Sequence, residues 1–353
     1  MDRELVIDGE SINDASDCYV IAEIGHNHQG SLQTAKELFR QAKACGANAV
    51  KLQKRDNRGL YTKAAYEKAY NSEASFGSTY GEHREALEFG EKEYRELARL
   101  AKELGLAFFA TAFDSASAEF LHKLDMPAFK IASGDIKSIP LLKQVASYGK
   151  PMIISTGGAE LADVKRAYDA IRPINEQIAI LQCTASYPAE FEQLDLRVIE
   201  TYRKAFPDAV VGLSAHDNGI AMSVVAYVLG SRIVEKHFTL NRAMRGTDHA
   251  FSLEPVGLSK MVRDLRRAKV AMGDGAKRIH ETEVAPIVKM SKKIVAARDL
   301  AAGHVLTASD LTFKSPGDGL FPYQLNDVMG RTLLRPLKTD DPLTLDLVSD
   351  GTK

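Results

Sequence analysis

The chain has 353 residues, too long for one ordinary domain and well matched to a barrel of about 250 residues with a smaller module beside it. Hydrophobic residues make up 45% of the chain and charged residues 26%, and no apolar run is long enough to cross a bilayer. The 46 Lys and Arg residues nearly balance the 47 Asp and Glu residues. This balance argues against a nucleic-acid or membrane-surface partner, because no overall field would draw the chain to a polyanion.

The N-terminal segment, MDRELVIDGESIND, carries acidic residues and lacks the basic-then-apolar order of a secretion signal, so we expect a cytoplasmic protein. Three cysteines, Cys18, Cys45 and Cys183, are few for this length and lie in apolar segments. Reduced, buried thiols are commoner in such places than disulfides, and we assign these cysteines no chemistry.

Short apolar runs alternate with longer amphipathic stretches from residue 19 onward, which is typical of repeated strand–helix units around a parallel sheet. We expect strands at 18–24, 48–53, 107–113, 128–133, 151–156, 178–184, 209–215 and 232–238. Helical patterns lie between them and again near 256–273, and several end in Gly, as helices often do. The pattern predicts an α/β protein with a closed (β/α)8 barrel rather than an open sheet.

Two segments break this rhythm. Residues 54–91 are too long and polar for a simple strand-to-helix connection, and in a barrel such a loop usually covers the mouth of the active site. Beyond about residue 274, a connector leads into short strands separated by turns. We therefore predict a barrel domain with its connector over residues 1–285 and a small β-rich domain over residues 286–353.

Two histidines follow the last two predicted strands. His216 comes after VVGLSA and His237 after IVEK, so both fall at carboxyl ends of strands, where a barrel collects its catalytic groups. Two imidazoles with positions left open for water or substrate suit a divalent metal such as Mn²⁺, with Mg²⁺, Co²⁺ or Fe²⁺ as alternatives. From spacing alone, hydrogen-bonded histidines lining the barrel top are an equally good interpretation.

Other polar side chains occur at the same ends of the strands. Lys51 and Lys130 stand in otherwise apolar strands, and burial of their charge without an anionic partner would be costly. With nearby hydroxyl donors, they predict a pocket for a phosphate or a carboxylate. The further polar residues at these ends are Glu23, Gln53, Thr111, Ser133, Ser155, Thr156, Ser214 and Glu235.

The chain resembles the N-acetylneuraminate (sialic acid) synthase family through motifs spread in order over almost its whole length. These are IAEIGHNHQGSLQTAKELFRQAKACGANAVKLQK, YGEHREALEF, FKIASGD, ISTGG, LQCTASYP, GLSAHDNG, VEKHFTL and GTDHAFSLEP. The YGEH and LQCT segments are most similar to the animal-type branch, which uses a 6-phosphorylated mannosamine. The C-terminal part resembles the antifreeze-protein-like (SAF) domain that this family of TIM-barrel enzymes carries.

This resemblance implies condensation of phosphoenolpyruvate with the open-chain aldehyde of an N-acylated hexosamine, without a nucleotide cofactor. It implies that His216 and His237 are the metal ligands and that Mn²⁺ is the expected metal. Glu23 matches a position beside the reacting carbon. The positions that hold the phosphate and carboxylate of phosphoenolpyruvate match Lys51, Thr111, Lys130, Ser133 and Ser214. Those that face the amino sugar match Gln53, Tyr187 and Asp248, and we add Glu235 to the substrate-binding residues.

Two departures from the family pattern concern the sugar. Ala185 stands where bacterial members acting on the unphosphorylated sugar have Asn, and Ser315 stands where they have an Arg that reaches the partner subunit's sugar. Lys314, Arg55 and Arg58 are candidate compensating cations, but solvated loop charges are the better interpretation of each. The acceptor therefore stays open between N-acetylmannosamine, its 6-phosphate, mannose 6-phosphate, and the sugars of legionaminate, pseudaminate or spore-coat polysaccharide synthesis.

The resemblance also implies a domain-swapped homodimer, in which residues 286–353 of one subunit cap the barrel mouth of the other. A polar barrel mouth needs water excluded during carbonyl chemistry, and a domain of under ~70 residues has a thin core of its own. Two other functions fit parts of the pattern. One is a Schiff-base aldolase with Lys130 as nucleophile, and the other is a non-catalytic carbohydrate-binding protein, which would have no need of two histidines and two lysines around one mouth.

Overall fold

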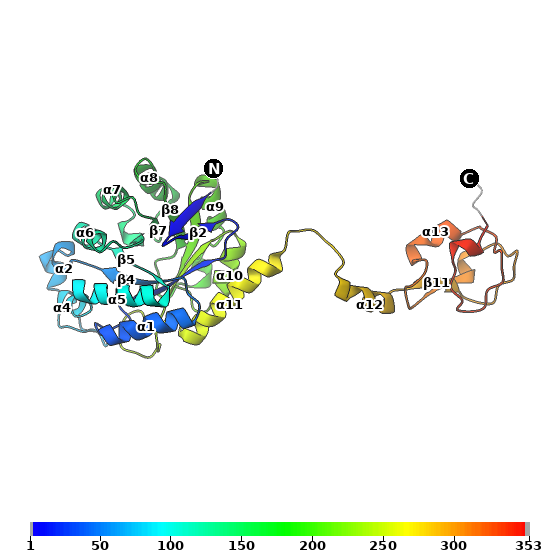
Figure 1. Ribbon diagram of the computed structural model, residues 1–353, viewed down its shortest axis with the longest axis horizontal. Coiled ribbons are helices and arrows are strands. Elements are labelled where there is room, and N and C mark those ends of the chain that lie inside the picture. Colours follow the sequence, from blue (N-terminus) through cyan, green and yellow to red (C-terminus); the bar gives the residue numbers. More distant parts are fainter. Residues whose placement is uncertain (1–2, 350–353) are drawn as a thin grey trace. The chain divides into compact units, whose positions relative to one another are not determined.

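The computed structural model describes residues 3–349 and shows the predicted α/β barrel (Figure 1). Within that range, eight parallel strands close on themselves in the order β10-β3-β4-β5-β6-β7-β8-β9. They are β3 (Tyr19–Gly25), β4 (Ala49–Lys54), β5 (Ala107–Ala112), β6 (Phe129–Ile131), β7 (Met152–Ser155), β8 (Ile178–Cys183), β9 (Val210–Ala215) and β10 (Ile233–His237). Each lies within or close to a predicted strand, so the prediction of a closed barrel is confirmed.

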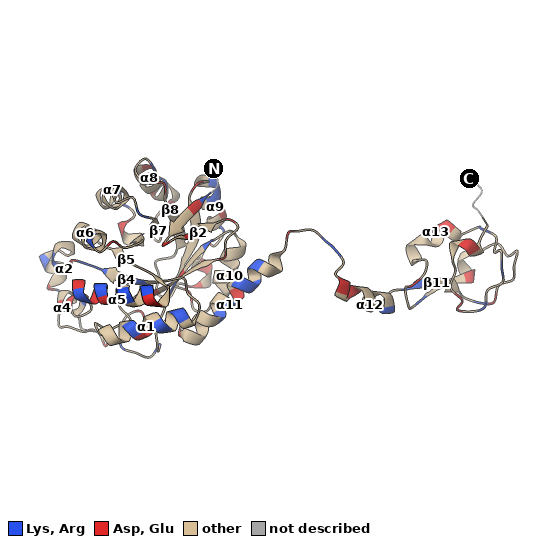
Figure 2. Ribbon diagram, in the orientation of Figure 1, with Lys and Arg blue, Asp and Glu red and all other residues tan. Residues whose placement is uncertain are grey.

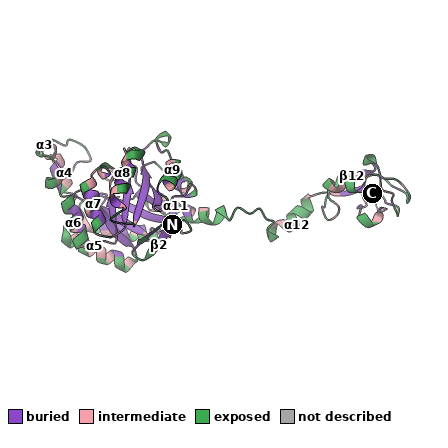
Figure 3. Cartoon of the chain, turned by 90° about the horizontal axis from the view of Figure 1, so that it is seen from above, coloured by how far each residue is buried: buried purple, intermediate pink, exposed green. Residues whose placement is uncertain are grey.

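The predicted helices pack around the barrel with their apolar faces against the strands. They are α1 (Leu32–Ala44), α5 (Glu91–Leu104), α6 (Ser115–Lys123), α7 (Ile139–Ser147), α8 (Leu161–Ile171), α9 (Val198–Ala205), α10 (Ala221–Val228) and α11 (Pro255–Met272). On α5, Tyr94, Leu97 and Ala101 are buried at helical spacing, while charged residues of both signs occupy the rest of the helix (Figures 2 and 3). None of the helices within residues 3–349 combines the length and apolar character needed to cross a bilayer.

A β-hairpin that sequence analysis did not predict precedes the barrel. It consists of β1 (Glu4–Ile7) and β2 (Glu10–Asn13). Asp8 and Gly9, between the strands, both adopt positive φ (51° and 83°), as the tight turns of two-residue hairpins require. Leu5, Ile7 and Ile12 are fully buried against side chains from the amino ends of the barrel strands. The hairpin therefore closes the amino end of the barrel, and a polar pocket has to form at the carboxyl end.

The long segment after β4 is folded rather than open. It contains three short helices, α2 (Asn57–Leu60), α3 (Lys63–Tyr66) and α4 (Tyr80–Glu85). Thr79 and Glu82 cap the start of α4 by exchanging side-chain-to-backbone hydrogen bonds. At the base of the segment, Lys54 Nζ lies 3.0 Å from Glu88 Oε2 and donates to the Phe89 carbonyl at 3.0 Å. These contacts hold residues 54–89 beside the barrel mouth.

The chain separates into two compact units after Gly273. The boundary predicted near residue 285 falls within a helix that sequence analysis treated as a connector, α12 (Glu281–Met290). The second unit also contains β11 (Lys293–Ala296), β12 (Leu311–Lys314) and α13 (Leu325–Val328), and β11 and β12 pair antiparallel. Its small core includes Ile294, Leu306, Val328, Leu333 and Leu343.

One buried carboxylate organises this small unit. Asp310 accepts hydrogen bonds from the Thr307 backbone N–H (2.8 Å) and hydroxyl (2.7 Å), from Arg298 Nη2 (2.5 Å) and from His304 Nε2 (2.8 Å). Burial alone would raise the pKa of Asp310, but these donors hold it well below its usual value. The Asp310 carboxylate therefore links the segments that carry Arg298, His304 and Thr307 in a unit with a small apolar core.

We expect Asp310→Asn to destabilise the second unit by about 1.5–3 kcal/mol, because the fully buried side chain at this position loses its charge and one acceptor oxygen, whereas the Arg298 and Thr307 donors remain. Hydrogen exchange of the full chain should speed up over residues 293–349 and not over the barrel. Since the folded-state pKa is lowered, the wild-type contribution is present at neutral pH and is lost as the pH falls below about 3.8. Exposed Asp327→Asn is the control, and equal exchange in the two variants would contradict the role of Asp310.

Candidate active site

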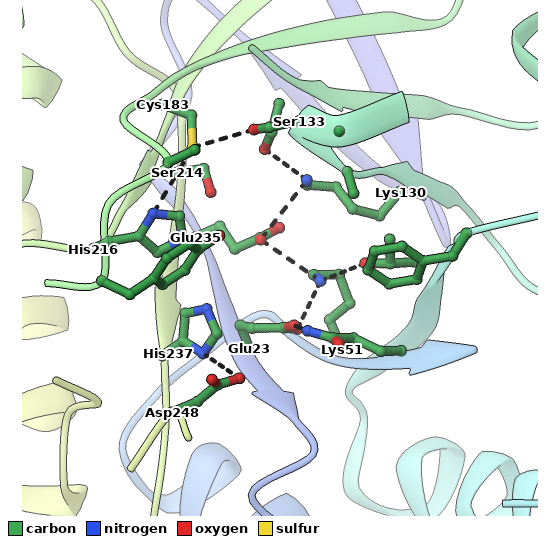
Figure 4. A pocket seen from close by; sticks show the side chains of 18 of the residues that line it. Glu23, Lys51, Lys130, Ser133, Cys183, Ser214, His216, Glu235, His237 and Asp248 are labelled. Atoms are coloured by element: carbon green, nitrogen blue, oxygen red, sulfur yellow. Dashed lines mark hydrogen bonds and ion pairs between the residues drawn. The ribbon is translucent and has the colours of Figure 1, made fainter. Parts of the chain in front are cut away.

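A pocket of about 430 Å³ lies at the carboxyl ends of the barrel strands (Figure 4). The structure brings all the predicted site residues to its walls, namely Glu23, Lys51, Gln53, Thr111, Lys130, Ser133, Tyr187, Ser214, His216, Glu235, His237 and Asp248. Ser155, Cys183 and Ala185 also line it. The roles assigned to these residues stay predictions, but their convergence gives the chain one polar pocket suited to chemistry.

Strand alternation and register explain why these side chains meet. Successive residues of a strand point to opposite faces, so alternate residues of one strand enter the barrel together. In the parallel register, His237 lies beside Glu23, and Thr111 lies beside Gln53 on one side and Lys130 on the other. Residues far apart in the sequence thus become neighbours on rigid strands, the best-ordered positions in such a fold.

Two buried lysines and two buried glutamates form the floor of the pocket. Lys51 Nζ lies 2.7 Å from Glu23 Oε2 and 3.6 Å from Glu235 Oε1, and Lys130 Nζ lies 3.8 Å from the same Glu235 oxygen. None of these side chains is more than 7% exposed. Two ammonium groups face two carboxylates, so the charges offset one another in a place where an isolated charge would be unstable.

Hydroxyl groups surround the two lysines. Lys51 Nζ donates to Thr111 Oγ1 at 2.7 Å, and Lys130 Nζ donates to Ser155 Oγ at 2.6 Å and to the Ile131 carbonyl at 3.0 Å. These bonds fix the positions of both ammonium groups. The pocket floor therefore presents a set of donors of the kind that binds phosphate and carboxylate groups.

The two glutamates are driven toward different protonation states. Burial raises the pKa of Glu23 above its usual value, in spite of the neighbouring Lys51. Burial acts on Glu235 in the same direction, but Lys130 and Lys51 outweigh it and lower the pKa of Glu235. Two carboxyl groups whose environments separate their pKa values are suited to different tasks, one as a proton carrier and one as a fixed negative charge.

The two histidine rings lie 5.4 Å apart between their centroids. His216 Nδ1 lies 2.8 Å from the Thr184 carbonyl oxygen, so this nitrogen carries the proton and Nε2 keeps its lone pair. Among the described residues, the buried Nδ1 of His237 has no hydrogen-bond partner, and burial lowers the pKa of His237 to about 3. One nitrogen on each ring is therefore available to a cation.

This donor set fits a divalent metal with two protein ligands. Within residues 3–349, no group of three or more His, Cys, Asp and Glu side chains is arranged to hold an ion. The carboxylate of Asp248 lies near this pair, with 3.8 Å between its Oδ2 and His237 Nδ1. Two imidazoles with several open positions suit a metal of intermediate softness that also takes oxygen ligands from substrate or water.

A buried ion pair outside the pocket holds the two histidine-bearing segments together, and sequence analysis missed it. Lys236 Nζ donates to Asp217 Oδ1 at 2.7 Å and to the Asp217 carbonyl at 2.5 Å, and both side chains are almost fully buried. Lys236 precedes His237 and Asp217 follows His216. The pair therefore fixes the separation of the two rings, and the sequence signal for it was a lysine within an otherwise buried strand.

The interpretation of Arg55 as a solvated loop charge is wrong. This residue is only 7% exposed, lines the pocket, and places its guanidinium 3.6 Å from the centroid of the Phe113 ring. A signal was available, because Lys51, Gln53 and Arg55 continue the alternation of β4 beyond the end of the strand. Other pocket residues that sequence analysis missed are Arg84, Phe113, Ala132, Gly134 and Thr247.

The other two candidate cations are exposed, as expected. Arg58 lies over the ring of Tyr66, and Lys314 pairs with Asp340 in the second unit. Ser315 also lies in the second unit, where its hydroxyl donates to the Met290 carbonyl at 3.2 Å. All three cysteines are free and buried, and Cys183 lies against His216, with 3.9 Å between Sγ and Nδ1.

Comparison with known proteins agrees with this architecture. Residues 38–277 match the NeuB family and residues 293–349 match the SAF domain. The chain is 41% identical over 337 residues to the N-acetylneuraminate-9-phosphate synthase of Homo sapiens, and the match covers 95% of this chain and 94% of that protein.

Two crystal structures share the fold at 30% identity. One is the N-acetylneuraminic acid (sialic acid) synthetase from Leptospira borgpetersenii in complex with citrate, with a TM-score of 0.69 over 81% of this chain and 96% of that one. The other is the spore coat polysaccharide biosynthesis protein spsE from Bacillus subtilis, with a TM-score of 0.67 over 99% of this chain and 100% of that one. The predicted resemblance is thus confirmed, and the chain belongs to the NeuB family, with a SAF domain following its barrel.

Proposed function

We propose that this chain is an enzyme that condenses phosphoenolpyruvate with an N-acylmannosamine or its 6-phosphate, giving a nonulosonic acid such as N-acetylneuraminate and releasing phosphate. The observation that carries the proposal is the pair of buried lysines, Lys51 and Lys130, in one pocket with two glutamates and two histidines. The product named for the human relative, N-acetylneuraminate 9-phosphate, supports the same product class.

Phosphoenolpyruvate carries a phosphate and a carboxylate, and the pocket floor is suited to both. The two lysines supply positive charge, and the hydroxyls of Thr111, Ser133 and Ser214 supply further donors. Gly157 helps to place one of them, because its backbone N–H donates to Ser133 Oγ at 2.9 Å and its missing side chain leaves that hydroxyl room. Charge-assisted bonds of this kind are about twice as strong as neutral ones.

The condensation needs one carbon–carbon bond and one water molecule. C3 of phosphoenolpyruvate bonds to the aldehyde carbon, and the aldehyde oxygen takes a proton. Water adds at C2, and the bond between C2 and its phosphate-bearing oxygen then breaks. Phosphate leaves with that oxygen, and the added hydroxyl loses its proton to become the ketone oxygen. Glu23 is the group suited to move a proton, because burial raises its pKa and Gln53 Nε2 fixes its Oε1 at 2.8 Å. Glu235 remains ionised and balances the lysines.

A divalent metal, Mn²⁺ or in its place Mg²⁺ or Co²⁺, would be held by His216 and His237 and would supply Lewis-acid polarisation of the aldehyde oxygen when bound. No nucleotide cofactor is required. The Thr184 carbonyl orients the His216 ring, and the ring of Tyr187 lies over it with 4.2 Å between the centroids. These contacts hold the metal-facing nitrogen in place before substrate arrives.

We also propose that the enzyme is a homodimer in which the second unit of one subunit caps the barrel mouth of its partner. In support, α12 exposes Val284, Ile287 and Met290, an apolar surface suited to burial against another chain. The three free, buried cysteines are consistent with a reducing compartment, and we place the reaction in the cytoplasm.

The first prediction concerns the reaction and its metal. Phosphate release from phosphoenolpyruvate should require an amino-sugar acceptor, stop with EDTA and return with Mn²⁺. His216→Ala and His237→Ala should each lower turnover at least ~100-fold, because each removes one of two protein ligands. His122→Ala, an exposed histidine outside the pocket, is the control.

Metal-dependent turnover retained in both site variants would remove the metal assignment. The rival Schiff-base aldolase gains some support from the burial that lowers the pKa of Lys130. It predicts EDTA-resistant turnover and a borohydride-trapped adduct on Lys130, and that result would replace the proposed condensation.

The second prediction concerns the anion site. Lys51→Ala and Lys130→Ala should raise the KM for phosphoenolpyruvate roughly 10- to 100-fold, since each loses a charge-assisted bond of about 1.5–3 kcal/mol. Lys63→Ala, an exposed lysine, is the matched control. Unchanged KM values for phosphoenolpyruvate in both pocket variants would show that the substrate binds elsewhere.

The third prediction concerns assembly. A chain ending at Gly273, the end of the first compact unit, should lose both dimeric mass in light scattering and most of its turnover, while circular dichroism shows an intact barrel. A truncated dimer with full turnover would show that the second unit neither completes the site nor joins the subunits.

A further inference from the structure

The two histidines of the pocket differ in how their Nδ1 atoms are held. A metal-binding imidazole is neutral and carries one N–H, and this group almost always donates to a carboxylate, a backbone carbonyl or water. In His216, Nδ1 lies 2.8 Å from the Thr184 carbonyl oxygen, which meets this requirement. In His237, Nδ1 is buried but has no hydrogen-bond partner among the described residues. One ring is therefore oriented for a cation, and the other lacks its orienting bond.

The carboxylate of Asp248 lies opposite this nitrogen of His237 (Figure 4). The distance from Asp248 Oδ2 to His237 Nδ1 is 3.8 Å, about 1 Å longer than a hydrogen bond from an N–H to a carboxylate. Because Nδ1 is directed at Asp248, Nε2 is the nitrogen of this ring that is left for a cation. Asp248 therefore stands where a partner for the N–H of His237 is required, slightly too far away to form the bond.

Hydrogen bonds tie the backbone of Asp248 to the strand that carries His237. The hydroxyl of Ser252 donates to the Asp248 carbonyl at 2.5 Å, and Asn27 Nδ2 donates to that hydroxyl oxygen at 3.0 Å. The same Nδ2 donates to the carbonyl of Phe238, the residue that follows His237, at 2.9 Å. Asn27 and Ser252 are both buried, so water competes little for these bonds. The main chain at Asp248 is therefore held at a fixed distance from the end of β10.

The side chain of Asp248 is less constrained than its backbone. It is 23% exposed, and its Oδ1 accepts a hydrogen bond from the Thr247 hydroxyl at 2.8 Å. Its Oδ2 lies beside Gly25, where an added Cβ would be 3.7 Å away. Because Gly25 has no side chain, the carboxylate has room to turn there. A rotation of the Asp248 side chain can therefore close a gap of about 1 Å to His237 while the backbone stays in place.

The position of Asp248 is compatible with two tasks. By resemblance we assigned this residue to the amino sugar, and it does line the pocket. It also faces His237 Nδ1, which is buried without an acceptor in the part of the chain that the structure describes. A contact with the sugar alone would leave that N–H unpaired, and an unpaired buried donor is destabilising. The unpaired nitrogen therefore favours a task at His237.

We propose that Asp248 is a positioning residue of the metal site, whose carboxylate accepts the Nδ1–H of His237 when Nε2 binds the divalent cation. This inference rests on the proposed function, which places the cation on His216 and His237. The bond fixes the tautomer and the orientation of the His237 ring and raises the basicity of its Nε2. The two rings are then held in the same way, one by the Thr184 carbonyl and the other by Asp248.

The test measures the Kd for Mn²⁺ of the full chain without either substrate, from the EPR signal of the free ion. Wild type should bind one ion that His216→Ala does not bind. Asp248→Ala should weaken this binding roughly 10- to 100-fold, the usual effect of removing the partner of a metal-binding histidine. Asp248→Asn keeps an oxygen that can accept the N–H, and it should weaken binding less. Asp169→Ala, which removes an exposed aspartate of α8, is the control and should leave the Kd unchanged.

Proton NMR of the Co²⁺-loaded chain identifies the ring that changes. Wild type should show two slowly exchanging, cobalt-shifted imidazole N–H signals. Asp248→Ala should lose the signal of His237 to solvent exchange and keep that of His216, because the Thr184 carbonyl still holds it.

Three results would contradict the proposal or its basis. An unchanged Kd for Mn²⁺ in Asp248→Ala, or two retained N–H signals, would overturn the inference and leave Asp248 to the sugar. Equal losses of affinity in Asp248→Ala and Asp248→Asn would show that the carboxylate acts through its charge alone, and would overturn the positioning role. Absence of Mn²⁺ binding in wild type would instead contradict the metal assignment of the proposed function.

Discussion

The four-charge cluster of Lys51, Glu23, Glu235 and Lys130 is the constraint on which the rest of the site depends. Each member is buried at the carboxyl ends of the barrel strands, so none is stable there without its opposite neighbours. Burial raises the pKa of Glu23, whereas Lys130 and Lys51 lower that of Glu235. This one arrangement of charges therefore places two ammonium groups where the proposed anionic substrate would bind, and it gives the pocket two chemically different carboxyl groups.

The barrel strands fix the positions of these four side chains. Parallel strands in fixed register place the charged side chains in adjacent rows, and the buried Lys236–Asp217 pair on the other face of β10 holds the segment after β9 against it. The site is thus supported from both sides of one strand, with Glu235 and His237 facing the pocket and Lys236 facing outward. The segment after β4 contributes another part of the wall, through Arg55 and through Arg84 of α4.

Much of this arrangement could be predicted from the sequence. Alternate residues of a strand face the same side, and a barrel collects its functional groups at the carboxyl ends of its strands. Both regularities can be applied once the strands are located in the sequence. Those two regularities were sufficient to bring His216, His237 and both lysines to one mouth. Neither regularity predicts the contacts of side chains that lie beyond the strand ends, so the burial of Arg55 against Phe113 was missed. The hairpin before the barrel was missed as well, although Asp8-Gly9 between alternating apolar residues is a strong turn signal.

The hairpin before the barrel determines the end at which the pocket opens to solvent. Because Leu5, Ile7 and Ile12 fill the amino end of the barrel, the pocket communicates with solvent at its carboxyl end. Lys51 and Lys130 are 2% and 3% exposed, whereas Tyr187 is 56% exposed. A ligand held by the lysines would lie at the closed end of the pocket, and one that rests against Tyr187 would lie nearer to solvent. In the proposed reaction, the amino sugar would then lie between phosphoenolpyruvate and the solvent.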